Sequence, residues 1–295
     1  MTEGNRSPAY TPTGRPSVVE RGAHTTDDGL FGPASLTWRL HAQRAMMLVG
    51  SGAATTQMLN PRVMRMIDQA SHFRQNPEAR AKGTFQYIIT ITYGDTATAK
   101  RAGEKLRRMH QAVLATDPNT GESYNAEVAE LLLWVHNTLT LTAVRAFQRY
   151  GPGLTDAEAD AYVREQIVAA ELVGIDPMLA PETVSELEEY MVQVRSSLAM
   201  IPEGLWFRDM MTAHGKGVAG LAEKFVKDAA IGLMLPEHRA LFGLQFSRRR
   251  DRIAERATKA LFALMDSKAP VERVIPDLRH QVDVAAFGAR RQPTA

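Results

Sequence analysis

The amino-acid sequence predicts an all-α protein built as a single-domain helical bundle. Segments with the apolar period of a helix follow one another from Ser35 to Asp266, and only short breaks separate them. Hydrophobic residues make up 44% of the chain, which is enough apolar surface for one sizeable core. Because no internal repeat or long linker divides the chain, we expect one helical domain over residues 30–289. A flexible arm (1–29) precedes it and a loose tail (290–295) follows it.

Start and stop signals define the first helices. Ser35 is expected to cap a helix that the glycines of 50–52 end. The Asn-Pro pairs at 60–61 and 76–77 each place Asn at an N-cap and Pro at the first helical position, so each predicts a new helix. Residues 85–93 are β-branched and aromatic, which favours a strand by propensity. No other segment alternates well enough to pair with such a strand, so we predict a buried helix there.

The remaining elements follow from caps and turns. Asp95 is expected to cap a helix that reaches Val113, and the Asp-Pro-Asn and Thr-Gly pairs of residues 116–123 predict a turn. Asn125 is expected to cap a long helix to residue 150, and Thr155 opens a capping box for the next one, to residue 173. Further helices are predicted at about 181–198, 205–211, 218–234 and 248–266.

Composition excludes several classes of protein. The chain has no cysteine, which rules out disulfides, iron–sulfur clusters, cysteine-ligated zinc and thiol nucleophiles. A net charge of +2 is too small to favour nucleic acid or an anionic membrane surface. No window approaches the roughly 18 apolar residues of a spanning helix, and the polar segment before Gly29 lacks the apolar core expected of a signal peptide. We therefore expect a cytoplasmic protein without stable membrane insertion.

Common catalytic motifs are absent or lack their context. Gly215–Gly220 matches the dinucleotide pattern G-x-G-x-x-G, but no strand precedes it, so we interpret it as a glycine-rich break between helices. No histidine has a glutamate three residues before it, and no two histidines are three or four residues apart. This excludes a carboxylate-bridged di-iron site and an H-E-x-x-H zinc site.

Single histidines on apolar helices remain as candidates. Most of them are interpreted as core or surface residues with ordinary hydrogen bonds: His41, His72, His214, His238 and His280. His110 differs, because Leu106, Met109 and Val113 place it in apolar surroundings. A neutral imidazole there needs a partner for each ring nitrogen, and a haem iron is one partner that suits an apolar, helix-lined pocket.

A series of short motifs adds a family resemblance. In order they are S-L-T-W-R, Q-x-x-N-P, S-H-F-R, R-A-K-G-T, Y-G-D, L-R-R-M-H, G-E-S-Y-N-A, W-V-H and I-G-L-M-L-P-E-H-R-A-L-F-G-L. Their order and spacing resemble the MpaB/rubber oxygenase (latex clearing protein-like) family over about residues 30–250. The resemblance implies an all-α fold and, as in the rubber-cleaving members, a b-type haem.

The resemblance also implies roles for individual residues. His110 would be the axial ligand of the haem iron, and Arg80 and Thr84 match the family's distal arginine and threonine. His136 belongs to the family pattern as a cofactor-site residue, and a structural histidine that hydrogen-bonds across the bundle explains it equally well.

Two arginines lie within one turn of His110. Arg107 and Arg108 could pair with haem propionates, since guanidinium binds carboxylates bidentately. An ordinary solvated face explains them as well, and Arg108 is the weaker candidate because residues two apart on a helix face different ways.

The chain departs from the family pattern at three positions. The distal lysine of the rubber-cleaving members falls on Gly83, and Lys82 is a neighbour rather than an equivalent. Many members have histidine where this chain has Asn60. Asp68 is the only carboxylate between residues 61 and 71, where a catalytic acid is expected. These differences weaken the prediction of rubber cleavage and leave the haem prediction intact.

We therefore predict a haem-b-dependent oxygenase that uses dioxygen on an apolar substrate, either isoprenoid-like or a small natural product. A non-catalytic haem- or lipid-binding helical protein is the alternative. A helical interaction protein without a cofactor is a third interpretation.

Overall fold

The structure is a computed structural model that describes residues 27–70, 73–268 and 271–290. Apart from one two-stranded sheet, its regular elements are helices, which confirms the all-α prediction. Most of the predicted arm and tail, together with His72, lies outside the described residues. Within these residues, no helix is both long and apolar enough to cross a bilayer.

The helices follow one another with short connections. They are α1 (Leu36–Leu40), α2 (Met46–Gln57), α3 (Pro61–Ala70), α4 (Pro77–Tyr93), α5 (Thr96–Ala112), α6 (Ala129–Tyr150), α7 (Asp156–Leu172), α8 (Val184–Gln193), α9 (Leu205–Thr212), α10 (Gly217–Gly232), α11 (Pro236–Leu241), α12 (Arg248–Lys268) and α13 (Val271–Arg290). Short 3-10 turns lie at Pro177–Leu179, Val194–Ser197 and Pro202–Gly204. The strands β1 (Leu114–Thr116) and β2 (Ser123–Asn125) pair antiparallel between α5 and α6.

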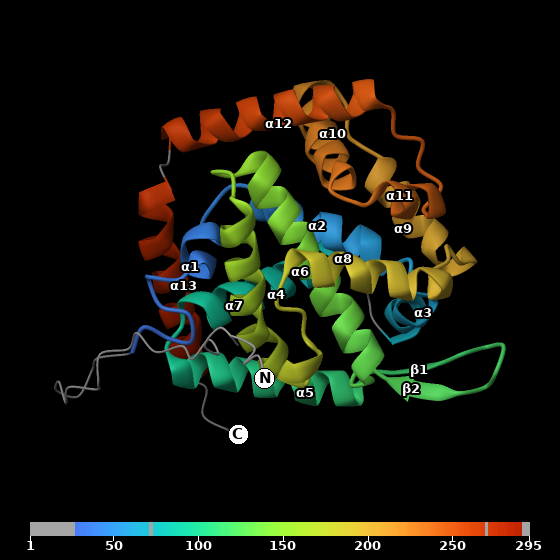
Figure 1. The fold of residues 1–295 in the computed structure, drawn as a ribbon, viewed down its shortest axis with the longest axis horizontal. Helices are drawn as coiled ribbons and strands as arrows, with labels where there is room; N and C mark the ends of the chain where they lie inside the picture. The colour runs from blue at the N-terminus through green and yellow to red at the C-terminus, as the bar shows by residue number, and fades with distance from the viewer. Residues whose placement is uncertain (1–26, 71–72, 269–270, 291–295) are drawn as a thin grey trace, which may run out of the picture.

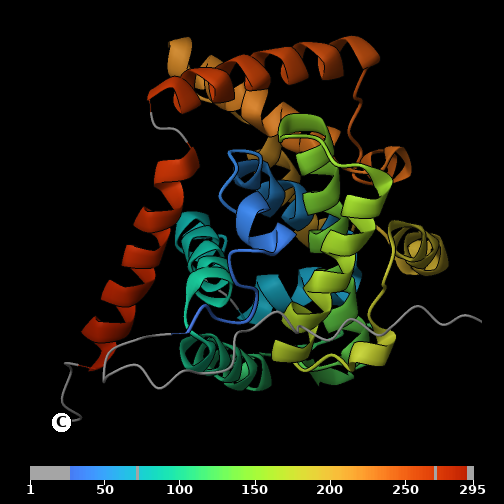
Figure 2. The same ribbon diagram turned by 60° about the vertical axis from the view of Figure 1, so that its left-hand side comes forward.

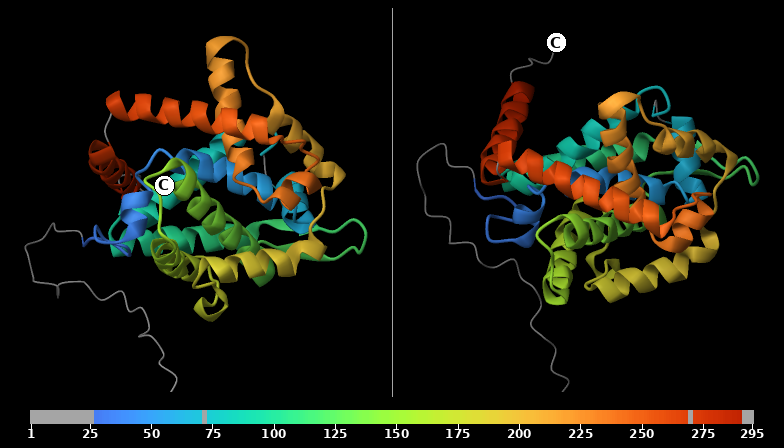
Figure 3. Two further views of the ribbon diagram at one scale, coloured as in Figure 1. Left: turned by 45° about the horizontal axis from the view of Figure 1, so that its top comes forward. Right: turned by 90° about the horizontal axis from the view of Figure 1, so that it is seen from above.

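Helices α2 and α6 pack against each other at the centre of the bundle (Figure 1). Helix α12 runs along one edge, α5 along the opposite edge, and the β1–β2 hairpin projects beyond the helices (Figure 1). Helix α13 stands on the outside against α4, as the turned view of Figure 2 shows. Helix α10 packs under α12 and extends past it at its N-terminal end (Figure 3).

Several predicted helix starts are confirmed. The side chains of Asn60 and Asn76 accept hydrogen bonds from the first turns of α3 and α4. Asp95 caps α5, and Thr155 and Glu158 form the two reciprocal hydrogen bonds of the predicted capping box of α7. Residues 85–93 lie in α4, where packing in the core overrides their strand propensity.

Other boundaries were predicted wrongly. The glycines of 50–52 lie inside α2, and the chain breaks at residues 41–45 instead. At Gly52 an added Cβ would lie 3.0 Å from Thr142 Cγ2 and 3.1 Å from the Ala230 carbonyl oxygen. This glycine therefore allows α2 to pack closely against α6 and α10, at the modest cost of a glycine in a helix.

The start of α6 was also predicted wrongly. Asn125 belongs to β2, and its side chain accepts a hydrogen bond from the backbone N–H of Glu127 (3.0 Å). The helix begins later, at Ala129, with Val128 as an N-cap that makes no side-chain bond. The predicted 181–198 helix ends at Gln193 and continues as a 3-10 turn. The sequence prediction also missed α11, α13 and the two hairpin strands. Three-residue strands are too short to show alternation.

His41 is a core histidine, as predicted. Its Nδ1 lies 2.9 Å from the Thr92 hydroxyl and its Nε2 lies 3.0 Å from the Tyr162 hydroxyl. Burial lowers the pKa of His41 from 6.5 to about 4. The ring is therefore held neutral in the folded protein.

This shift predicts a loss of stability in mild acid. As the pH falls, His41 is protonated in the unfolded state at a higher pH than in the folded state. The contribution of His41 to the free energy of unfolding should therefore be complete above pH 6.5 and should decrease as the pH drops towards 4. At about 1.4 kcal/mol per pKa unit, the loss amounts to about 3 kcal/mol. Urea unfolding at pH 7 and pH 4.5 measures it. In His41→Gln the loss between pH 7 and pH 4.5 should shrink by about 3 kcal/mol, and a remainder should persist because the pKa of His136 is also lowered to about 4. The exposed-site variant His214→Gln should keep the full loss. An unchanged pH dependence in His41→Gln would contradict the prediction.

Candidate functional site

The predicted site residues lie on three helices. Arg80 and Thr84 are on α4, His110 is in the last turn of α5, and His136 is on α6. Helices α4 and α5 pack against each other, and the β1–β2 hairpin leads the chain from α5 back to the start of α6 (Figure 1). Helix α4, the last turn of α5 and the connection from the hairpin to α6 form the candidate site.

The His110 ring faces a carboxylate that the sequence prediction missed. Its Nδ1 lies 3.6 Å from Oε1 of Glu127, in the connection between β2 and α6. Both atoms are buried, and neither has a hydrogen-bond partner. Burial lowers the pKa of His110; the negative charge of Glu127 raises it and the positive charge of Arg80 lowers it. The ring is therefore neutral near pH 7 and has one nitrogen lone pair available for a metal.

Arg80 is close enough to act electrostatically on His110. Its guanidinium carbon lies 5.5 Å from the centre of the Phe73 ring, in the geometry of a cation–π contact. The residue is solvent-exposed, yet enough protein surrounds the guanidinium for desolvation to lower its pKa. Thr84 follows one turn later and shares the same side of α4.

The first half of α4 has an unusual exposure. All of residues 78–85 are exposed, which is more than two turns, although a surface helix ordinarily buries one face. Phe85 is 43% exposed, and Met109 on α5 is 54% exposed. At Gly83 an added Cβ would meet no atom within 4 Å, so packing among the described residues does not require glycine there. This half of α4 therefore keeps a surface open to a ligand beside Arg80 and Thr84.

The two arginines on α5 differ. Nε of Arg107 lies 3.6 Å from Oε2 of Glu127, so this arginine contacts the carboxylate that faces His110. The side chain of Arg108 is 69% exposed and lies 4.0 Å from Glu104. The structure brings Arg107 to the candidate site and leaves Arg108 on a solvated face.

His136 is partly buried, and desolvation lowers its pKa to about 4. Among the described residues, no side chain or backbone group hydrogen-bonds its ring. The cross-bundle hydrogen bond that would give it a purely structural role is therefore not formed by these residues.

Tyr87 is a second residue that the sequence prediction missed. It lies on α4 at the i+7 position from Arg80 and the i+3 position from Thr84, so the three share one side of the helix. Its hydroxyl is buried without a hydrogen-bond partner, and burial raises its pKa. Helical spacing from Arg80 and Thr84 would have identified Tyr87. Glu127 has no such spacing signal, because the hairpin separates it from His110.

Asp68, the only carboxylate in the α3 region where a catalytic acid is expected, forms an ion pair. Oδ1 of Asp68 lies 3.3 Å from the guanidinium of Arg74, and the Asp68 side chain is 26% exposed. Its carboxylate is therefore already balanced by a positive charge.

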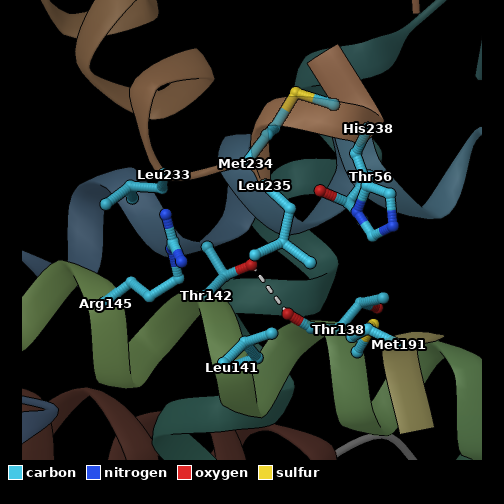
Figure 4. Close-up of a pocket in the computed structure, with 10 residues that line it drawn as sticks. All are labelled: Thr56, Thr138, Leu141, Thr142, Arg145, Met191, Leu233, Met234, Leu235 and His238. Carbon is cyan, nitrogen blue, oxygen red and sulfur yellow. Dashed lines mark hydrogen bonds between the residues drawn. The ribbon is translucent and has the colours of Figure 1, made fainter. Parts of the chain in front are cut away.

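A small cavity lies beside α6 (Figure 4). Its lining residues come from α2, α6, α8 and the α10–α11 connection: Thr56, Thr138, Leu141, Thr142, Arg145, Met191, Leu233, Met234, Leu235 and His238. With a volume of about 10 Å³ it has room for a single water molecule. This cavity is too small for a substrate.

Comparison with known protein families shows the family of the chain. The profile described as "ER-bound oxygenase mpaB/B'/Rubber oxygenase, catalytic domain" matches residues 38–265. The chain belongs to this family. The matched segment contains every candidate site residue named above. Membership in an oxygenase family implies dioxygen and a small-molecule substrate.

The fold of this mpaB/rubber oxygenase family member is similar to a solved structure titled "Structure of Latex Clearing Protein LCP in the closed state". The TM-score is 0.56, the sequences are 16% identical, and the alignment covers 83% of this chain and 74% of the other. At this identity the likeness shows a shared fold alone. No curated protein sequence matches the chain.

Proposed function

We propose that this member of the mpaB/rubber oxygenase family is a haem-b-dependent oxygenase that acts on an apolar, isoprenoid-like or small natural-product substrate. One observation carries the proposal. A neutral His110 ring turns Nδ1 towards a buried carboxylate, as metal-ligating histidines do, while Arg80 places positive charge nearby.

The donor set fits a haem. A single neutral imidazole is the axial ligand of many haem proteins, and the unpartnered Nδ1 and carboxylate Oε1 form the kind of support that such a ligand needs. In this assignment Nε2 of His110 would hold the iron. The bound haem would supply the activation of dioxygen, which amino-acid side chains do not provide.

The residues of α4 have separate tasks in this proposal. Arg80 stabilises negative charge that develops during the reaction, because a fixed positive charge in a partly desolvated site costs no reorganisation. The Thr84 hydroxyl orients the reacting groups. Burial keeps Tyr87 protonated, so it can donate a hydrogen bond. The exposed side chains of Phe85 and Met109 offer apolar surface to a substrate.

Two measurements test the proposal. The protein is expressed with a haem precursor, and its absorption spectrum is recorded; a Soret band is expected, and its absence would overturn the haem assignment. Oxygen consumption is then followed with a panel of apolar alkenes and terpenoids. At least one member should raise it above the rate without substrate.

Arg80 is expected to affect turnover rather than cofactor content. In Arg80→Met the rate of substrate-dependent oxygen uptake should fall about 100-fold, the usual cost of removing one group that stabilises developing charge. Haem per protein should stay unchanged. Lys82→Met is the matched control, because it removes the same charge two residues away, on the other side of α4. Equal rates in the two variants would show that Arg80 has no special role.

The alternative is a helical protein that binds haem or a lipid-like molecule without converting it. It is favoured by glycine at position 83 and by the ion pair that engages Asp68. A Soret band together with unchanged oxygen consumption across the whole panel would support this alternative.

A further inference from the structure

We propose that Glu127 is a positioning residue for His110. Its carboxylate accepts a hydrogen bond from Nδ1–H of the imidazole and thereby fixes the ring so that Nε2 would be free to bind the iron. This inference rests on the proposed haem function. It concerns a residue outside the helices that carry the predicted site residues.

The two facing atoms of Glu127 and His110 have no other polar partner among the described residues. Oε1 of Glu127 and Nδ1 of His110 are 3.6 Å apart, and each is a buried polar atom with no hydrogen-bond partner. The Glu127 side chain is only 16% exposed. A buried carboxylate oxygen and a buried imidazole nitrogen are costly to leave unpaired. A small movement of either side chain would bring them to hydrogen-bond distance and satisfy both.

Backbone hydrogen bonds hold the two residues in register. The carbonyl oxygen of His110 accepts from the N–H of Ala126 (3.3 Å), and Leu114 pairs with Asn125 in the hairpin. The Asn125 side chain then accepts from the N–H of Glu127 (3.0 Å). The hairpin therefore returns the chain directly to His110 and places Glu127 beside its ring.

The second carboxylate oxygen has its own contact. Oε2 of Glu127 lies 3.6 Å from Nε of Arg107. The Arg107 guanidinium in turn lies over Gly174, where an added Cβ would be 3.0 Å from Nε. Gly174 leaves room for Arg107, whose positive charge lies beside Oε2 while Oε1 faces His110.

Helix capping does not account for Glu127. The N-cap of α6 is Val128, and no side chain caps the helix there. Glu127 therefore serves no capping bond, and its carboxylate is directed to His110 and Arg107 instead. A carboxylate that accepts the Nδ1–H of a ligating histidine fixes its tautomer and raises the basicity of Nε2.

Resonance Raman spectroscopy and haem loss test the role of Glu127. In the ferrous holoprotein, Glu127→Gln should lower the iron–histidine stretching frequency, since a neutral amide makes Nε2 less basic. Haem transfer to apomyoglobin should be about 10-fold faster or more, the usual cost of losing such a support. Glu127→Asp, which keeps the carboxylate, should change both the stretching frequency and the rate of haem loss less than Glu127→Gln does. Thermal unfolding of the haem-free proteins checks that the fold is unchanged.

Glu130→Gln is the matched control. Glu130 lies three residues further on, its side chain is 84% exposed, and its nearest cation is Arg62 at 4.0 Å. This variant should match the wild type in stretching frequency and haem loss. If Glu127→Gln also matches the wild type in both, Glu127 does not position His110.

The outcomes separate this inference from the proposed function. A wild-type protein without a Soret band overturns both. A wild-type haem protein in which His110→Ala loses haem, but Glu127→Gln changes neither frequency nor haem loss, overturns only the role of Glu127. A change in thermal unfolding alone, with both haem readouts unchanged, also contradicts it.

Discussion

Replacing His110 with alanine is expected to abolish haem retention. The variant removes the only group proposed to bind the iron from the protein side, so the loss should exceed the roughly 10–100-fold cost of deleting a supporting residue. It also leaves Oε1 of Glu127 buried without the ring that faces it. The Soret absorbance per protein, after expression with a haem precursor and gel filtration, measures the effect.

His214→Ala serves as the control for this experiment. His214 is exposed, and its Nδ1 lies 3.0 Å from the backbone oxygen of Gly215, outside the candidate site. This variant should retain haem as the wild type does. Full retention in His110→Ala would show that another residue binds the iron, and His136 would be the next residue to replace.

The largest effect on stability is expected at Asp228. Asp228 is 2% exposed, and its carboxylate contacts Lys224 of α10 (2.6 Å) and Arg250 of α12 (2.5 Å). The contact with Arg250 joins α10 to α12. Asp228→Asn leaves two cations without their anion, and breaking a buried pair in this way costs about 3–5 kcal/mol. Because both cations remain one-third exposed, we expect about 3 kcal/mol in the free energy of unfolding by urea.

The exposed ion pair of Asp209 provides the comparison. Its side chain is 69% exposed next to Arg208, so Asp209→Asn should change the free energy of unfolding by about 0.5 kcal/mol or less. Equal effects of the two variants would show that the Asp228 cluster is as weak as a surface pair.

The Asp228 cluster also has a pH signature. Burial raises the pKa of Asp228, but hydrogen bonds from Arg250 and Lys224 outweigh burial, and the net pKa lies below its usual value of 3.8. The stability that this group contributes is therefore complete above pH 3.8 and is lost as the pH falls below that value. The loss belongs to a more acidic range than that of His41, which begins below pH 6.5.

The family resemblance, rather than any local pattern, related Arg80, Thr84 and His110 on two different helices to one site. Arg80 and Thr84 are four residues apart on α4, and the structure places them on one side as the spacing requires. Arg108 was grouped with His110 through closeness in sequence, but its side chain faces solvent. The relation between His110 and Glu127 crosses a hairpin, and no local pattern encodes it.

The sequence by itself determined the helices whose signals are local, and the family. Asn60, Asn76, Asp95 and Thr155 each cap a helix through hydrogen bonds to residues within one turn, so the sequence around them carries the signal. Tertiary structure alone decided that the glycine at position 52 lies inside a helix, and that Glu127 meets His110. Both depend on contacts between segments distant along the chain: the packing of α2 against α6 and α10, and the register of the β1–β2 hairpin. Such contacts are set by how whole elements fit together, which short-range propensities do not specify.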